Sequence, residues 1–409
     1  MVVNSATPRI FLRTMTGRDP AETHRASTPL ELLFDLCFVV AVSRAAATLH
    51  VAVASGHVRH AVAGYVTVFF AIWWAWLNFT WFASAYDTDD IPYRLLTFVQ
   101  IAGVLVLASG VTVAFDGGFQ TITIGYVIMR LALTAQWLRA AACNPSGRRT
   151  ALRYVGGLTV TQLGWVTRLA LPPAWGSWTL AFLVACELAL PFWAARHSGV
   201  TPWHPGHIAE RYGLFTIIVL GECVLSAFLA IEAGINAGGY TVRLMTVAAA
   251  GLVTMFGLWW SYFRLGADGM LRERPHVAFL WGYGHYFLFS AIAAFGAGIA
   301  VVAERAVSHT RSAALYHLGV ETQALAFAAP VGIALLLLAL MRPLVHGAHH
   351  ITDVAAYVAA VLVIVVGAMA GSIGLSLSLA MVASIVVVGV AVDLIWPRHR
   401  PAGPVTATE

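Results

Sequence analysis

The sequence predicts an all-α fold, a polytopic bundle of about twelve transmembrane helices. Three observations lead to it. Hydrophobic residues make up 59% of the 409 positions and charged residues only 11%, whereas a soluble domain carries about 25% charged residues. Apolar stretches of membrane-spanning length recur along the chain, and arginine gathers on alternate connections between them. Together these features are typical of an integral membrane protein.

The apolar stretches have the length that a helix needs to cross the hydrocarbon core, about 20 residues. The first follows a polar tail over residues 1–29. Because this stretch is long and has no evident cleavage site, we expect a transmembrane helix rather than a signal peptide. The expected spans are 30–53, 61–84, 94–114, 119–140, 151–171, 176–195, 208–231, 242–263, 277–302, 318–341, 354–371 and 374–396.

Arginine is distributed asymmetrically about these spans, and the chain contains no lysine. With the N-terminus in the cytoplasm, seventeen arginines fall on the cytoplasmic side, five fall on the other side, and Arg44 and Arg130 lie within spans. This is the pattern of the positive-inside rule. We therefore expect a multi-pass membrane protein with both tails, 1–29 and 397–409, in the cytoplasm. The missing lysine excludes a retinal-type pump, which needs a Schiff base.

A weak internal repeat appears when the chain is shifted against itself. Phe34 then aligns with Phe215, and Asp87 aligns with Asp268. The repeat predicts two six-helix halves, 30–196 and 197–396, in a parallel arrangement with a pathway lined by the first and seventh helices. The alternative is that two apolar helices share aromatic residues by chance.

The first span opens with two carboxylates, Glu31 and Asp35, that share one helix face because they lie four residues apart. A negative charge at a helix N-terminus is favoured by the helix dipole, which explains the pair without any function. Asp35, however, lies within an apolar run and must face a partner or water rather than lipid. We therefore count both as candidates for a transport pathway.

Glu222 lies near the middle of the seventh span, where a carboxylate must be protonated, paired or hydrated. A role in a pathway and a buried structural pair are both open. Its neighbour Gly221 is expected to let another backbone approach closely.

Other ionisable side chains within spans are further pathway candidates. Arg130 cannot lose its charge, so it needs an anion, and Glu222, Glu187 or Asp35 can provide one. Arg44 and His285 complete the set. His285 is a candidate for a proton-linked site, although such a histidine is more often a hydrogen-bonded packing residue.

A histidine-rich connection follows the tenth span. It has the HxxHH spacing of membrane di-iron desaturases, and a second fragment, 204–207, carries two more histidines. A di-iron site needs about eight imidazoles from several such boxes, so the alternatives are a regulatory metal site or a solvated loop. The candidate ligands are His346, His349, His350 and Asp353.

At these motifs the chain resembles the bacterial low temperature requirement A family, over about residues 24–396. The resemblance implies a polytopic protein of the bacterial inner (plasma) membrane. It is carried by the run 31–41, which contains Phe34, by His207, Glu210 and Arg211 with the run 212–215, by Gly221 and Glu222, and by the pair 285–286.

The Phe34-Asp35 pair before an apolar run is also similar, more distantly, to the two-repeat endolysosomal potassium channels. In that family the motif carries a serine between the two residues, which is missing here, and Phe215 is followed by Thr216 rather than an aspartate. The similarity implies a pore lined by the first and seventh helices.

The leading functional expectation is a transporter of an ion or small solute, not an enzyme, with no cofactor. Its expected partners are the lipid bilayer and the transported species, not nucleic acid, and assembly into a homo-oligomer stays open. An ion channel is the first alternative. The second is a lipid-modifying metalloenzyme that uses the histidines of the 346–350 loop.

Overall fold

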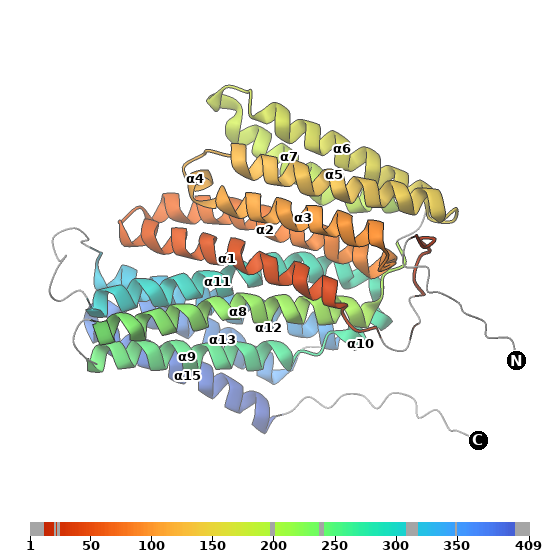
Figure 1. The fold of residues 1–409 in the computed structure, drawn as a ribbon. Coiled ribbons are helices and arrows are strands. Elements are labelled where there is room, and N and C mark those ends of the chain that lie inside the picture. Colours follow the sequence, from red (N-terminus) through yellow and green to blue (C-terminus); the bar gives the residue numbers. More distant parts are fainter. Residues whose placement is uncertain are drawn as a thin grey trace, which may run out of the picture. The chain divides into compact units, whose positions relative to one another are not determined.

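The computed structural model describes residues 12–19, 22, 25–196, 201–236, 241–307, 318–347 and 350–396. Every regular element among them is helical (Figure 1). The predicted all-helical fold class is therefore confirmed.

The helices follow the predicted spans closely. The long helices are α1 (Pro29–Ala54), α2 (Val58–Tyr86), α3 (Ile91–Ser109), α5 (Gln120–Cys143), α6 (Arg148–Arg168), α7 (Gly176–Ala195), α8 (Pro205–Asn236), α9 (Val242–Phe263), α11 (Ala278–Val307), α12 (Val320–His346), α13 (Ile351–Ala368) and α15 (Leu375–Ile395). Short helices are α4 (Val111–Phe115), α10 (Asp268–Glu273) and α14 (Ala370–Ile373), with 3-10 turns at Pro173–Trp175 and Pro275–Val277.

Among the described residues, eleven helical segments are long and apolar enough to cross a membrane. The long helix outside this set is α6, which corresponds to the predicted span 151–171. It begins three residues earlier, at Arg148, and it carries Arg149 and Arg153 in its first turns. The described helices thus support the polytopic bundle, with α6 more polar than a typical span.

The chain divides into two compact units. Unit 1 comprises residues 1–52, 57–219 and 271–275, and unit 2 comprises 53–56, 220–270 and 276–409. The division runs through α8, whose first half belongs to unit 1 and whose second half belongs to unit 2. The two six-helix halves expected from the repeat stay a prediction.

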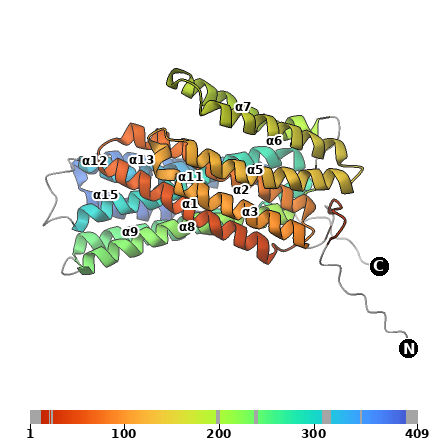
Figure 2. The same ribbon diagram turned by 45° about the horizontal axis from the view of Figure 1, so that its top comes forward.

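Within unit 1, α5, α6 and α7 lie side by side (Figures 1 and 2). The α3 and α5 backbones touch through two glycines. A Cβ on Gly125 would lie 2.5 Å from the Leu107 nitrogen and 2.7 Å from the Gly103 oxygen. Side chains at these positions would separate the helices, so small residues fix this close crossing.

The segment before α1 is not a free tail where the structure describes it. We call residues 12–19, 22 and 25–28 the strap. The Arg18 amide donates to the Ala85 carbonyl oxygen, and Met15 is fully buried. Arg139 of α5 pairs with Asp90 before α3 and donates to the Arg13 carbonyl oxygen. The strap therefore packs against the end of α2, the start of α3 and the end of α5.

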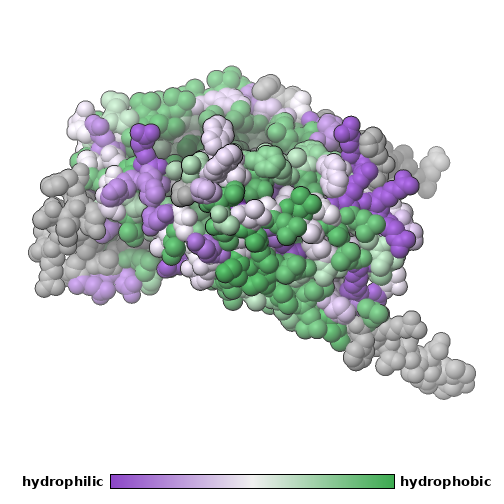
Figure 3. All heavy atoms as spheres, turned by 90° about the horizontal axis from the view of Figure 1, so that it is seen from above, coloured by the Kyte–Doolittle hydropathy of each residue, from purple (hydrophilic) through white to green (hydrophobic). Residues whose placement is uncertain are grey.

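The surface has the polarity expected of a membrane protein. On the face seen in Figure 3, hydrophobic residues cover much of the middle and hydrophilic residues gather toward the two ends. Large apolar side chains such as Leu131, Val160 and Phe182 are exposed on their helices. In water such a surface would be unfavourable, whereas lipid accepts it.

Candidate functional site

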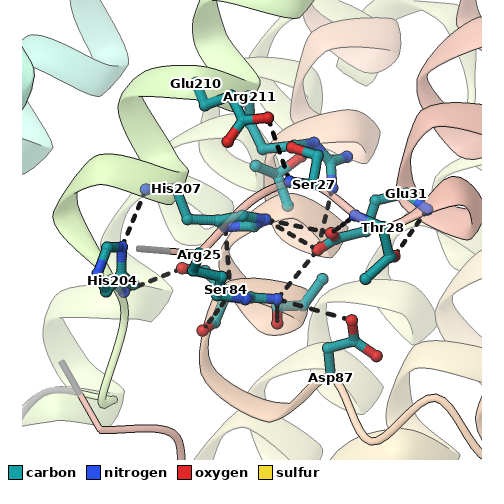
Figure 4. A network of polar contacts seen from close by, with 12 residues as sticks. Arg25, Ser27, Thr28, Glu31, Ser84, Asp87, His204, His207, Glu210 and Arg211 are labelled. Carbon is teal, nitrogen blue, oxygen red and sulfur yellow. Dashed lines mark hydrogen bonds and ion pairs between the residues drawn. The ribbon is translucent and has the colours of Figure 1, made fainter. Parts of the chain in front are cut away.

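A buried cluster of charged side chains lies where α1 and α8 begin and α2 ends, entirely within unit 1 (Figure 4). We call it the ion network. Its side chains come from the strap, from α1, from the residue after α2 and from α8. They are Arg25, Glu31, Asp35, Asp87, His207 and Arg211.

Glu31 is the hub of the network. The Thr28 amide donates to its Oε2 over 2.8 Å, and the Thr28 hydroxyl accepts from the Glu31 amide over 3.3 Å. With Pro29 between them, the two residues form a capping box at the start of α1. The same carboxylate lies 3.2 Å from Arg25, 3.1 Å from His207 and 3.3 Å from Arg211. One residue therefore both starts the helix and anchors the charges.

Arg211 connects the two carboxylates of α1. It pairs with Glu31 and, one helical turn deeper, donates to Oδ1 of Asp35. The Trp76 indole donates to the same oxygen over 2.8 Å, and Thr80 accepts from Arg211 over 3.3 Å. The expectation that Asp35 faces a partner rather than lipid is confirmed.

Aromatic rings close the deeper side of the network. Phe34 is fully buried with its ring centroid 3.9 Å from that of Phe79. Trp76 and Phe215 approach to 4.3 Å, and Phe38 lies 6.4 Å from Phe215. These rings keep water from the charges, so each charge depends on protein partners.

Arg25 joins the strap to α2 and α1. Its guanidinium donates to the carbonyl oxygens of Ser84 over 2.6 Å and Ala83 over 2.8 Å, and to Glu31. Asp87 lies 3.8 Å away. Burial lowers the pKa of Arg25, while the charge of Glu31 opposes that effect. The Ala83 oxygen also accepts from the Asp87 amide over 3.1 Å. Because α2 ends at Tyr86, the carbonyl groups of its last turn are open to a side-chain donor such as Arg25.

Two histidines complete this end of the site, and their contacts determine their tautomers. The His207 amide donates to Nδ1 of His204 over 3.1 Å, so Nε2 of His204 carries the proton and donates to the Glu22 carbonyl oxygen over 2.8 Å. His207 lies between Arg25 and Glu31, with Nδ1 3.2 Å from the guanidinium. Glu210, one turn along α8, accepts from the Ser27 amide over 3.1 Å.

Arg130 and Glu187 form a second buried pair in unit 1, separate from the ion network. They approach to 3.0 Å. Glu187 also accepts from the indoles of Trp74 and Trp165, while Arg130 donates to Asn78. Of the three anions predicted for Arg130, Glu187 is the partner. The full set of hydrogen bonds favours a structural role.

In unit 2, His285 is surrounded by aromatic rings. Its Nδ1 lies 2.7 Å from the Trp281 carbonyl oxygen, and its Nε2 lies 3.2 Å from the Tyr262 hydroxyl. The Trp281 and Phe289 rings pack edge-on against the imidazole. This arrangement matches the packing alternative for this histidine.

Glu222 is also buried in unit 2, packed against α11. A Cβ on Gly296 would lie 3.0 Å from the Glu222 Cγ. The expected role of Gly221 was wrong, because it is exposed and a Cβ there would meet nothing within 4 Å. Gly296, not Gly221, permits the close approach at this level. Arg44 is exposed on α1 and donates to Thr112 over 3.1 Å.

The histidine-rich connection forms a helix cap where the structure describes it. The His350 ring accepts from the Thr352 amide over 3.3 Å, and Asp353 accepts from the His350 amide over 2.9 Å. His346 is exposed, and His349 lies outside the described residues. No three His, Cys, Asp or Glu side chains among the described residues are placed to hold a metal ion.

Several polar contacts were not predicted from the sequence. Arg25 was counted only as a cytoplasmic arginine and Asp87 only as part of the repeat. In unit 2, Arg342 at the end of α12 donates to Asp393 at the end of α15 over 2.8 Å. For Arg25 and Asp87 the sequence offered one weak signal. Arg25 lies four residues before the start of α1, Asp87 directly follows the end of α2, and both were predicted on the same side of the bundle.

Comparison with known proteins agrees with these motifs. The sequence model of the family described as bacterial low temperature requirement A protein (LtrA) matches residues 26–392. This range includes the whole ion network except Arg25. An uncharacterized protein of Rhizobium meliloti (strain 1021) is 27% identical over 283 residues, which cover 66% of this chain and 67% of the relative. No solved structure matches the chain. The chain therefore belongs to the bacterial low temperature requirement A family of membrane proteins.

Proposed function

We propose that this protein transports an ion or a small solute across the bacterial inner membrane, and that it is not an enzyme. The end of unit 1 that holds the ion network and the strap faces the cytoplasm in this proposal, with both chain termini on that side. The arginine distribution supports this orientation.

The observation that carries the proposal is the buried contact of Arg211 on α8 with Asp35 and Glu31 on α1. A charged side chain within a membrane-spanning helix costs free energy, and such residues are typical of ion and substrate pathways. A purely structural contact between two helices is made at least as well by apolar side chains. The ion network therefore favours a site at which charge is bound or exchanged.

The arrangement also links charge to conformation. Arg25 ties the strap to the end of α2, while Arg211 ties α8 to α1. A cation or proton that competes for Glu31 weakens its contacts with Arg25 and Arg211, and one that competes for Asp35 weakens the contact with Arg211. We propose that this competition opens the cytoplasmic end of α1 and α8, the helices expected to line the pathway.

The test is ion flux in proteoliposomes with potassium, sodium and proton gradients imposed separately, and with empty vesicles as background. The variant is Asp35→Asn, which keeps the side-chain size. The matched control is Glu187→Gln, because Glu187 also accepts from an indole and an arginine but lies outside the ion network.

With flux normalised to folded protein, we expect protein-dependent flux of at least one ion, lost in Asp35→Asn and retained in Glu187→Gln. Equal flux in wild type and Asp35→Asn, with both proteins folded, contradicts the role of the ion network. No protein-dependent flux of any of the three ions contradicts ion transport and directs the assay to organic solutes. Unitary currents without coupling to a second gradient identify a channel rather than a carrier.

A further inference from the structure

The ion network contains more carboxyl groups than guanidinium groups. Glu31, Asp35 and Asp87 face Arg25 and Arg211, and His207 is the remaining ionisable group. Asp87 is 7% exposed, and the other five side chains are more deeply buried. With every carboxyl group ionised and His207 neutral, one negative charge is in excess, and such a charge is costly in a buried site.

His207 does not supply the missing positive charge in this arrangement. Its Nδ1 faces the Nη1 of Arg25 at 3.2 Å, and a guanidinium nitrogen can only donate. Nδ1 must therefore be the unprotonated acceptor, and Nε2 carries the proton that is donated to Glu31. The imidazole is thereby fixed as the neutral form, since a second proton on Nδ1 would point at the Arg25 donor.

The three carboxyl groups differ in the number of donors that stabilise their charge. Glu31 accepts from the Thr28 amide, Arg25 and His207. Asp35 accepts from Trp76 and Arg211 through Oδ1, while its buried Oδ2 has no hydrogen-bond partner among the described residues.

Asp87 has the weakest set of donors. Its Oδ1 accepts from the Asp89 amide over 3.0 Å, and its buried Oδ2 has no hydrogen-bond partner among the described residues. The Arg25 guanidinium lies 3.8 Å from Oδ2. Asp35 also has an unused buried oxygen, but its other oxygen contacts the Arg211 guanidinium directly, whereas Asp87 has no cation at hydrogen-bond distance among the described residues. Asp87 is therefore the natural place for a proton.

The charges around Asp87 act in both directions. Arg18 and Arg25 of the strap favour its ionised form, and Glu31 on α1 disfavours it. On α3, Tyr93 and Arg94 also interact electrostatically with Asp87, and the buried Tyr93 hydroxyl has no hydrogen-bond partner among the described residues. Burial, followed by the charge of Glu31, raises the pKa of Asp87 from 3.8 to about 6.

We propose that Asp87 is an exchangeable proton-binding site that neutralises the ion network. A proton from water binds the free Oδ2 and cancels the excess negative charge. When Asp87 releases it to water, the charge returns beside Arg25, the residue that holds the strap. The proposal concerns proton binding by the protein itself, so it stands or falls independently of transport.

Infrared difference spectroscopy of the purified full-length protein tests the site. Between about pH 8 and about pH 5, where ordinary aspartates stay ionised, a carboxylic C=O band should appear with a midpoint near pH 6. The band should be lost in Asp87→Asn and kept in Asp89→Asn. Asp89 is the matched control because it is two residues away but pairs with Arg94 at the surface.

A second measurement needs no variant. Isotopic labelling of the aspartate side-chain carboxyl carbon should shift the band, whereas labelling of glutamate should leave it unchanged. A band that persists in Asp87→Asn, or that shifts with glutamate labelling, overturns the assignment. Loss of the band in Asp35→Asn alone would also overturn it, because the proton would then reside one turn deeper. If the wild type shows no carboxylic C=O band in this pH range, the assignment is likewise overturned.

Discussion

Asp35 on α1 and Arg211 on α8 form a buried ion pair although 176 positions separate them in the sequence. Glu31, one turn before Asp35, contacts the same guanidinium. Arg211 thus contacts both carboxylates of the α1 motif, and the charged residues at the starts of α1 and α8 form one contact.

Removal of Arg211 should destabilise the protein strongly. In Arg211→Met, Asp35 keeps only the Trp76 donor and becomes a buried charge without a cation. The loss expected for a broken buried pair is about 3–5 kcal/mol, which thermal unfolding in detergent measures as a clear fall in Tm. The double variant Arg211→Met with Asp35→Leu should recover much of the lost stability, because it leaves no unpaired charge at Asp35.

Arg44→Gln is the control for that measurement, because Arg44 is exposed and its guanidinium donates only to Thr112 among the described residues. Its effect should stay within about 0.5 kcal/mol. An Arg211→Met protein as stable as the control would show that the pair with Asp35 does not form.

The raised pKa of Asp87 predicts that the stability of the protein depends on pH. Its folded pKa, about 6, lies above its ordinary value of 3.8, so its contribution to stability is fully present below about pH 4 and is lost as the pH rises through 6. Asp87→Asn removes this dependence. The variant should match wild type at acid pH and be more stable above pH 6, by on the order of 1–3 kcal/mol.

The measurement is Tm of both proteins across that pH range, because the difference cancels the other titrating groups. If Asp87→Asn were less stable than wild type above pH 6, the ionised carboxylate would have to be the favoured form. The predicted sign would then be wrong.

The Glu187 site should behave as a structural pair. In Glu187→Gln, one oxygen becomes an amide that donates, so one of the indoles of Trp74 and Trp165 loses its acceptor and Arg130 loses its counter-ion. We expect a loss of about 3 kcal/mol or more in stability. Arg130→Met combined with Glu187→Leu should be more stable than either single variant, as a thermodynamic cycle would show. Additive losses would mean that the two side chains act independently.

The glycines give a direct test of helix packing. Gly125→Ala places a Cβ against the α3 backbone, and relieving this clash requires the two helices to separate. We therefore expect a loss of about 1–3 kcal/mol or more in the free energy of unfolding. Gly221→Ala meets nothing and should be neutral or stabilising by up to about 1 kcal/mol, because alanine favours a helix. Comparable losses in both variants would contradict the exposed position of Gly221.

The span pattern was predictable because it depends on local composition. The predicted span 30–53 corresponds to the helix Pro29–Ala54, and the predicted span 242–263 corresponds to Val242–Phe263. Glu31 and Asp35 were singled out from the sequence as pathway candidates, and His207 and Arg211 as motif residues. Nothing in the sequence indicated that they would meet in one cluster.

The pairings themselves were not predictable, because they join segments far apart in the chain. Arg130 had three candidate anions of similar depth, and only packing selects Glu187. Arg25 was hidden in a polar segment without periodicity, where the sequence predicts no structure. Gly221 was misread for the same reason: a helical glycine shows that close approach is allowed, not that another helix is there.

The distance in sequence between Asp35 and Arg211 has a consequence for synthesis at the ribosome. At about 5–20 residues per second, the 176 positions between them take roughly 10 to 35 s to appear. During this interval α1 has reached the membrane with two carboxylates and no Arg211. The nascent helix must therefore wait at the bilayer surface, in the insertion machinery or in protonated form until α8 emerges. Assembly of α1 with α8 is thus a late event, and a chain that stalls before residue 211 exposes an unfinished helix to quality control.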